Sequence, residues 1–476
     1  MTTDLPNAAA VAARLERLPV SSWHRKLVVI VGIGLFFEFF EVFAGSVLLA
    51  VLRPAWELGP LESALLVGSV FFGMFTGALT LGRLADRFGR KRMFIINLMI
   101  YLGFGLLAAA APNVWWLIAC RFLAGLGAGA EAALIPTYLS EFIPRQRRGR
   151  YIGLAMTIGF LSFPVVSLLG APLAQVFWLI DGWRWLLIIG SSGVVLVVWM
   201  RRNLPESPRW LVATGQTAKA EAELARIEAT IMRRTGTPLP PVPEVASIEP
   251  ATRAAEIPRP EFVRRVLAIG ALLVFGTMGY YGFGSLAPVL LVDKGFDVTQ
   301  SLIYTAIIAI GYPLGAALAS FVAESLERRA LVITAAAGTG LFGLVFGFAA
   351  SDWLILLAGF LVGVAANVLG SSSTMYMAEV FPTRIRSTMV GVCYSLGRLS
   401  AGVMPFVGLP ILAAFGAAGV LIASAVLLSF ACLFVLVFGP RTTGLSLEQL
   451  TEPGVAAQVI LAPENSNTAG TLPEVR

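Results

Sequence analysis

Long apolar runs, separated by short polar loops, recur along almost the whole chain. Twelve of these runs reach the length of about 20 residues that an α-helix needs to cross a bilayer. The pattern predicts an all-α membrane protein with twelve transmembrane helices, although two closely spaced runs can also form one helix. The expected spans are 27–50, 62–81, 93–111, 115–138, 151–175, 183–200, 265–291, 301–321, 330–350, 353–377, 388–410 and 414–438.

One long hydrophilic stretch divides the apolar runs into two sets of six. It contains QTAKAEAELARIEATIMRR, which has the composition of a charged surface helix, and then TPLPPVP, which is typical of a stiff linker. It has too few apolar residues to form the core of an enzymatic domain. The predicted parts are an N-terminal segment 1–26, a six-helix bundle 27–200, a linker 201–264, a second six-helix bundle 265–438 and a tail 439–476.

Lysine and arginine are distributed unevenly over the polar segments. The N-terminal segment, the loops after each even-numbered span and the C-terminal tail hold 30 of the 35, whereas the opposite loops hold only Arg53, Arg184 and Lys294. Loops rich in these residues remain in the cytoplasm, so both termini are predicted to be cytoplasmic, in a bacterial inner membrane. The net charge of +7 follows from this topology and requires no nucleic-acid partner.

The composition limits the chemistry of the chain. Hydrophobic residues make up 57% of it and charged residues 13%, which is typical of an integral membrane protein. The three cysteines fall inside expected spans, and His24 has no His or Cys near it in the sequence, so we expect no disulfide framework and no metal site. No catalytic constellation is present, and we expect neither a cofactor nor an enzymatic activity.

Five charged residues lie well inside the expected spans, away from their ends, namely Glu38, Glu41, Arg121, Glu131 and Arg398. A charge at this depth costs several kcal/mol unless it is paired or faces a polar cavity, and it therefore marks a candidate functional site. Glu38 and Glu41 share one helix face, and burial that competes with a nearby arginine makes such carboxylates candidate proton carriers. Alternatively, one glutamate only holds Arg121 in a permanent salt bridge.

Arg121 and Glu131 lie about 15 Å apart along an ideal helix, so each needs a partner elsewhere. We expect a carboxylate of the first span to pair with Arg121, while Glu131 is either a second proton site or a structural ion-pair partner.

Arg398 is the candidate for binding an anionic substrate, because a guanidinium can hold a carboxylate with two hydrogen bonds. The alternative is that it pairs with a buried carboxylate. Phe40, Tyr280, Tyr281 and Asn367 are the expected lining of an otherwise apolar pocket. For the aromatic residues, simple packing or contact with lipid is the competing interpretation.

The two halves of the chain align at a constant offset of 238 residues. Parallel six-helix repeats are a transporter architecture in which two halves rock about a central site. The shift matches loop charges but none of the five embedded charges, so we expect the loop charges to form a conformational gate and the embedded charges to form the site. The expected gate residues are Asp86, Arg87, Arg90, Glu141, Arg148, Glu379 and Arg386.

Four motifs in order carry a family resemblance: GRLADRFGRKR, RFLAGLGAG, PESPRWL and GLSLEQL. Across residues 25–450 the chain resembles a major facilitator superfamily transporter. The seventh span lacks the paired glutamines of sugar porters, and the tenth lacks their tryptophan. Both are more similar to bacterial metabolite:proton symporters related to synaptic-vesicle proteins. That resemblance implies transport of small organic acids, such as nicotinate or aromatic carboxylates, and places Glu41 where related symporters carry a proton-coupling aspartate.

The expected function is therefore proton-coupled uptake of a small organic anion by alternating access. A sugar:proton symporter, a drug or metabolite exporter and, from another class, a transporter-like sensor are the alternatives. The expected partners are a small-molecule substrate, the proton and the lipid bilayer, with no nucleic acid, and the expected assembly is a monomer.

Overall fold

A computed structural model describes most of the chain. The described residues are 8–88, 90–144, 147–174, 177–202, 204–242, 259–322, 326–381 and 383–440. Within them the chain is helical except for loops and one two-stranded antiparallel ribbon.

The elements follow one another without any larger sheet. They are α1 (Ala8–Glu16), α2 (Ser22–Ala55), α3 (Pro60–Phe88), α4 (Arg90–Ala109), α5 (Val114–Phe142), α6 (Arg148–Phe160), α7 (Ser162–Leu173), β1 (Phe177–Trp178), β2 (Ile180–Asp181), α8 (Gly182–Arg202), α9 (Pro208–Ala213), α10 (Thr217–Thr235), α11 (Arg259–Ala271), the π-helix η2 (Leu272–Gly276), α12 (Thr277–Gly284), α13 (Ala287–Asp293), α14 (Val298–Ala309), α15 (Gly311–Val322), α16 (Arg328–Phe348), α17 (Asp352–Val380) and α18 (Thr383–Phe438).

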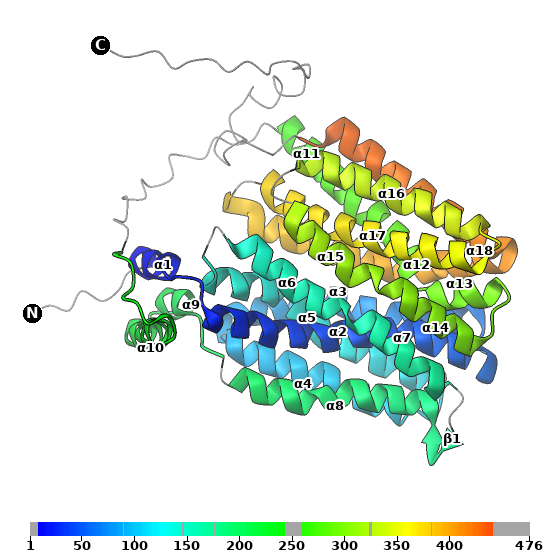
Figure 1. Ribbon diagram of the computed structural model, residues 1–476, viewed down its shortest axis with the longest axis horizontal. Helices are drawn as coiled ribbons and strands as arrows, with labels where there is room; N and C mark the ends of the chain where they lie inside the picture. Colours follow the sequence, from blue (N-terminus) through cyan, green and yellow to red (C-terminus); the bar gives the residue numbers. More distant parts are fainter. Residues whose placement is uncertain are drawn as a thin grey trace, which may run out of the picture.

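The long helices lie side by side along the longest axis of the molecule (Figure 1). We call the end that carries α1, α9 and α10 the α10 end, and the end that carries β1 and α13 the α13 end. The first-half helices α2–α8 occupy the lower part of Figure 1 and the second-half helices α11–α18 the upper part, with α6 packed on α15, α7 on α14 and α3 on α18.

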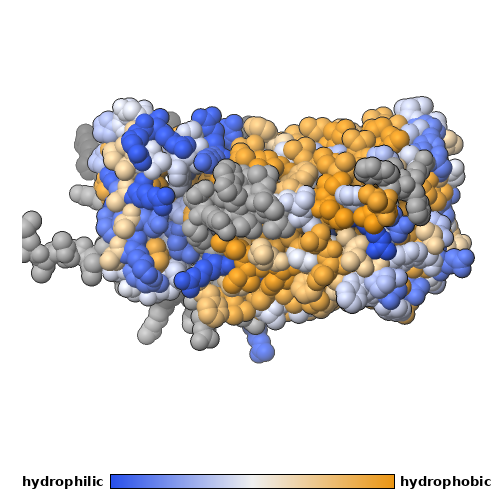
Figure 2. Space-filling model, turned by 90° about the horizontal axis from the view of Figure 1, so that it is seen from below, coloured by the Kyte–Doolittle hydropathy of each residue, from blue (hydrophilic) through white to orange (hydrophobic). Residues whose placement is uncertain are grey.

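Apolar residues cover the middle of the molecule, and hydrophilic residues gather towards its ends (Figure 2). In the described part of the chain, nine helical segments are long and apolar enough to cross a membrane. This arrangement confirms the predicted all-α membrane protein.

One of these segments contains two expected spans. Helix α18 runs through 388–410 and 414–438, but Gly416 has φ 67° and ψ −171°, outside the helical region, and so divides it. A residue with a side chain is strained at this φ, whereas glycine adopts it freely. The Asp293 side chain accepts a hydrogen bond of 2.7 Å from the N–H of Ala417 and so satisfies one donor at this break.

Proline explains three other interruptions. Helices α6, α12 and α14 end at Phe160, Gly284 and Ala309, and in each case a proline follows four residues later. Proline has no N–H to donate to the carbonyl four residues before it, and its ring clashes with that carbonyl. The fifth, seventh and eighth expected spans are therefore broken helices.

Glycines allow α3 and α5 to pack closely, as the sequence RFLAGLGAG predicts. A Cβ atom built on Gly125 would lie 2.1 Å from the carbonyl oxygen of Val70, and one on Gly129 would lie 2.1 Å from that of Met74. No side chain fits at such a distance, so backbones touch here, as in other close membrane helix pairs.

At the α10 end, the N-terminal helix α1 packs against the linker. Arg14 donates hydrogen bonds to Glu228 at 2.7 Å and to Glu221 at 2.7 Å, and Arg17 donates to Glu228 at 2.8 Å. Burial of Glu228 favours its neutral form, but the hydrogen bonds from the two arginines outweigh this effect and hold the pKa of Glu228 below its ordinary value of 4.5. The linker helix α10 is thus charged, as predicted, and two of its glutamates form ion pairs with arginines of the N-terminal segment.

Two repeat-related tyrosines hold matching chain segments. The hydroxyl of Tyr138 on α5 donates to the carbonyl of Pro205 at 2.8 Å, and that of Tyr376 on α17 donates to the carbonyl of Pro440 at 2.7 Å. Each proline follows the last long helix of its half. The two halves of the repeat therefore share this tyrosine–carbonyl hydrogen bond as well as their sequence similarity.

Candidate functional site

Arg121 lies in a buried ion pair with the first long helix. Its Nη1 atom is 3.0 Å from Oε1 of Glu41, its Nε donates to the carbonyl of Leu66 at 3.0 Å, and its Nη2 donates to the carbonyl of Glu41 at 3.3 Å. The Arg121 side chain is fully buried. The structure thus places a first-span carboxylate beside Arg121, as expected. The contacts of Arg121 connect α5 to α2 and α3.

The absence of a side chain at Gly45 makes room for this ion pair. A Cβ atom at Gly45, one turn after Glu41 on α2, would lie 2.5 Å from Nη2 of Arg121. The guanidinium therefore lies directly over the α2 backbone, where the two contacts to Glu41 fix its orientation.

Arg398 lies in a different environment. Its Nη1 donates to the hydroxyl of Tyr281 at 2.9 Å, its Nη2 donates to the hydroxyl of Tyr394 at 2.6 Å, and the guanidinium lies 4.7 Å from the Tyr394 ring centre. Glu38 of α2 interacts electrostatically with both Arg398 and Tyr394. The first and second halves of the chain therefore meet here through opposite charges.

Aromatic rings extend this cluster on both sides. The Tyr281 ring lies 4.7 Å from Phe71 of α3 and 4.8 Å from Tyr280. Asn367 on α17 lies near the hydroxyl of Tyr280, and its side-chain amide donates to the carbonyl of Gly363 at 3.3 Å. The structure thus brings Tyr280, Tyr281, Asn367 and Arg398 together, and their role as the lining of a substrate pocket stays a prediction.

Phe40 lies elsewhere. Its ring is fully buried against α8, where a Cβ atom on Gly190 would lie 2.7 Å from it. Phe40 and Glu38 are two residues apart on one helix, and side chains two residues apart point to different sides. The structure therefore supports the packing interpretation for Phe40.

The expected gate residues are only partly described. Arg148 lies 3.1 Å from Glu16 of α1, which is also 3.5 Å from Arg209. Glu379 lies 3.1 Å from Arg328, and Glu141 is buried. The side chains of Asp86, Arg87, Arg90, Glu131 and Arg386 lie outside the described residues.

Three further residues belong to these clusters although the sequence did not single them out. Tyr394 precedes Arg398 by four residues, a helical spacing that could have indicated the contact. Glu16 sits in an N-terminal segment with no motif, and no signal pointed to its ion pair. Tyr312 is buried among Phe43, Phe163 and Tyr280, which only the tertiary packing reveals.

The described residues contain no group of three or more His, Cys, Asp or Glu side chains that could hold a metal ion. Two arginine–carboxylate combinations lie between the long helices: Arg121 pairs with Glu41 within the first half, and Arg398 interacts electrostatically with Glu38 between the halves. Membrane-length helices with charged side chains buried between them are typical of a multi-pass membrane protein of the transporter class.

The chain belongs to the sugar (and other) transporter family, whose model matches residues 56–453. It is 30% identical over 452 residues to the inner membrane metabolite transport protein YdjE of Escherichia coli, covering 93% of this chain and 98% of that protein. It is 30% identical over 447 residues to the niacin transporter NiaP of Acinetobacter baylyi, and the match covers 92% of this chain and 99% of that protein.

The fold is similar to that of solved transporters. A partially occluded inward-open structure of the xylose transporter XylE from Escherichia coli aligns with a TM-score of 0.71 and 20% identity, over 90% of this chain and all of that chain. The predicted major facilitator fold is confirmed.

Proposed function

We propose that this transporter couples proton movement to the uptake of a small organic anion that carries a carboxylate. The observation that supports this most is the environment of Arg398, whose guanidinium donates hydrogen bonds to the neutral hydroxyls of Tyr281 and Tyr394. Neutral acceptors orient a guanidinium but do not balance its charge, which Glu38 opposes electrostatically. A carboxylate substrate would do so through charge-assisted hydrogen bonds.

Rings beside the arginine suit an aromatic acid. The ring of Tyr281, in the second half of the chain, lies between two other rings. Its centre is 4.7 Å from that of Phe71 in the first half and 4.8 Å from that of Tyr280. Offset or edge-on packing against these rings favours a flat substrate by about 0.5–1.5 kcal/mol per ring pair. The name of the relative NiaP, a niacin transporter, agrees with a ring that bears a carboxylate.

Glu38 would link substrate to proton. It interacts electrostatically with Arg398, so a substrate carboxylate competes with Glu38 for the same guanidinium. A carboxylate that loses its cationic neighbour in an apolar setting binds a proton more readily. Substrate binding and protonation of Glu38 would therefore favour each other.

Glu41 would be the main proton carrier, with Arg121 as its switch partner. The pair is fully buried and 3.0 Å long, so protonation of Glu41 must release the Arg121 guanidinium. Arg121 keeps the carbonyl of Leu66 as an acceptor in that event. The competing role is a permanent salt bridge, and the Glu41→Gln variant separates the two.

Alternating access would occur between bundles 27–200 and 265–438, which meet through α3–α18, α6–α15 and α7–α14. The Arg328–Glu379 and Arg148–Glu16 pairs would stabilise one conformation, together with Glu141 and the undescribed Asp86, Arg87, Arg90 and Arg386. We place the α10 end, with both termini, in the cytoplasm of a bacterium, because the positive charges of the chain concentrate on that side. The protein would work as a monomer.

The test is uptake of labelled carboxylates into proteoliposomes, with and without an imposed inward proton gradient. We expect nicotinate or an aromatic carboxylate to accumulate only with the gradient. Arg398→Ala should raise the apparent KM at least tenfold, whereas Arg226→Gln, at a side chain that is 73% exposed, should leave it unchanged. An unchanged KM in Arg398→Ala would exclude the anion site.

A sugar:proton symporter is the second candidate, favoured by the family description and by the likeness of fold to XylE. A sugar has no carboxylate to bind Arg398. Competition of unlabelled xylose or glucose with the labelled substrate therefore distinguishes the two functions in the same assay.

A further inference from the structure

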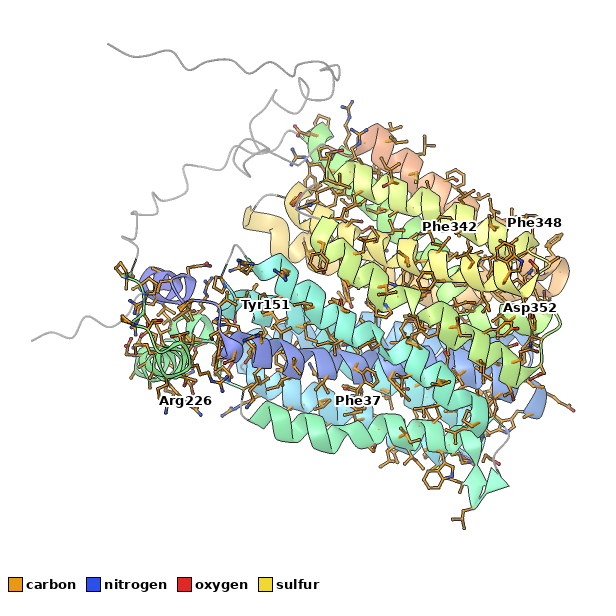
Figure 3. The ribbon with its side chains drawn as sticks, in the orientation of Figure 1. Phe37, Tyr151, Arg226, Phe342, Phe348 and Asp352 are labelled. Atoms are coloured by element: carbon orange, nitrogen blue, oxygen red, sulfur yellow. The ribbon has the colours of Figure 1, made fainter. Side chains whose placement is uncertain are left out.

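A cavity lies at the α10 end, and none of the residues of the Arg398 cluster lines it. Its volume is about 680 Å³, within the range of about 300–1,000 Å³ typical of small-molecule sites. The segment between α1 and α2 forms one wall, and the start of α6 forms the other. Figure 3 shows Tyr151, one of the lining residues, at this start of α6.

The cavity is strongly cationic. It is lined by four arginines, Arg17, Arg25, Arg147 and Arg150, and of its described lining residues only Glu16 is acidic. That carboxylate is already held by two arginines that do not line the cavity, at 3.1 and 3.5 Å. The lining therefore has an excess of positive charge.

Most of this charge is uncompensated. Arg17 pairs with Glu228, but Arg25, Arg147 and Arg150 form no ion pair with any described residue. All three are exposed. Arginines clustered without carboxylates repel one another, and a bound anion removes that repulsion.

The backbone adds to the anion preference. Helix α6 has 13 residues and begins at Arg148, and Arg147 at its N-cap makes no side-chain capping hydrogen bond. The helix dipole favours an anion at such a terminus. The arginine forks and this terminus together match a phosphate group, which accepts several charge-assisted hydrogen bonds.

Apolar residues form the remaining wall. Val20 and Leu154 are 38% and 39% exposed, and both line the cavity beside Tyr151. Helices α2 and α6 run from this end towards the middle of the molecule (Figure 1), where apolar residues cover the surface (Figure 2). A ligand with a phosphate and an apolar part would contact both kinds of wall, and basic pockets at the cytoplasmic membrane surface bind such head groups.

We propose that this cavity is a binding site for a phosphate group. The group can belong to the head of an anionic phospholipid or to a soluble organic phosphate. The site is independent of the proposed substrate, since no residue of the Arg398 cluster lines it.

The test measures binding to the purified, delipidated full chain by native mass spectrometry. The probes are dioctanoyl phosphatidylglycerol, dioctanoyl phosphatidylcholine, glycerol 3-phosphate and inorganic phosphate. The variant is Arg147→Gln/Arg150→Gln, and the control is Arg226→Gln, whose side chain is labelled on α10 in Figure 3 and does not line the cavity.

We expect the double variant to bind phosphatidylglycerol at least tenfold more weakly than wild type and the control to bind it equally well. Loss of phosphatidylglycerol binding alone identifies a lipid site, and loss of glycerol 3-phosphate or phosphate binding identifies a soluble phosphate. Equal binding by wild type and double variant, or no binding of any probe, overturns the proposal. Should the double variant fail to fold, the single variant Arg25→Gln is measured with the same expectation.

Discussion

Replacement of Glu41 by glutamine should destabilise the protein more than any surface charge change. The substitution keeps the shape of the side chain but leaves Arg121 fully buried with an uncompensated charge. Removal of one partner of a buried ion pair costs about 3–5 kcal/mol. Arg121 retains the backbone carbonyls of Leu66 and residue 41 as acceptors, so we expect the lower value, about 3 kcal/mol of unfolding free energy.

A double-mutant cycle with Arg121→Met measures this pairing directly. Both charges are absent in Glu41→Gln/Arg121→Met, and we expect it to lose less unfolding free energy than the two single variants combined, by about 1–3 kcal/mol. The assay is reversible unfolding in mixed micelles, followed by circular dichroism.

The matched control is Glu223→Gln on α10, whose partner Arg226 lies 3.9 Å away and is 73% exposed. Surface pairs of this kind contribute about 0–1 kcal/mol. Strict additivity in the Glu41–Arg121 cycle, or a loss in Glu41→Gln no larger than in the control, would refute the buried ion pair.

Three further predictions concern packing, the repeat and pH. Gly129→Ala should lower the unfolding free energy by about 1–3 kcal/mol, because the added Cβ would lie 2.1 Å from a backbone oxygen; Gly103→Ala, with nothing within 4 Å, should not lower it, and equal losses would contradict the packing. Tyr376→Phe should cost about 1 kcal/mol in the same unfolding assay by removing its hydrogen bond of 2.7 Å, and no loss would show that this contact does not form. The lowered pKa of Glu228 means that its carboxylate stabilises the docking of α1 above about pH 4.5 and that this stabilisation disappears as the pH falls through the lower folded-state pKa. Amide exchange in α1 should accelerate over that acidic range in wild type and in Glu223→Gln, and it should already be fast at neutral pH in Glu228→Gln.

Hydrophobic length predicts the helices well because each membrane span must satisfy its backbone internally. The expected span 330–350 overlaps α16 almost throughout, and 353–377 lies within α17. The sequence analysis did not place the breaks at Phe160, Gly284 and Ala309, although the prolines that follow could have indicated them.

Side-chain partners were less predictable than helices. A pair between Arg121 and a first-span carboxylate followed from the cost of burying each charge, because Arg121 could not reach Glu131. Only the structure identifies that carboxylate as Glu41. The interaction of Glu38 with Arg398 joins residues 360 positions apart, and only the packing of α2 against the second half reveals it. The direction of Phe40 also depends on how α2 is rotated, which periodicity alone does not fix in a helix apolar on most sides.

Internal pH of proteoliposomes during substrate entry tests the central proposal most directly. Addition of the accumulated carboxylate outside vesicles with an enclosed pH dye, at equal starting pH, should acidify the lumen in wild type because protons enter with the substrate. Glu41→Gln should exchange labelled for unlabelled substrate without any pH change. Entry of the carboxylate into wild-type vesicles with no acidification, or unchanged acidification in Glu41→Gln, would contradict the proposal.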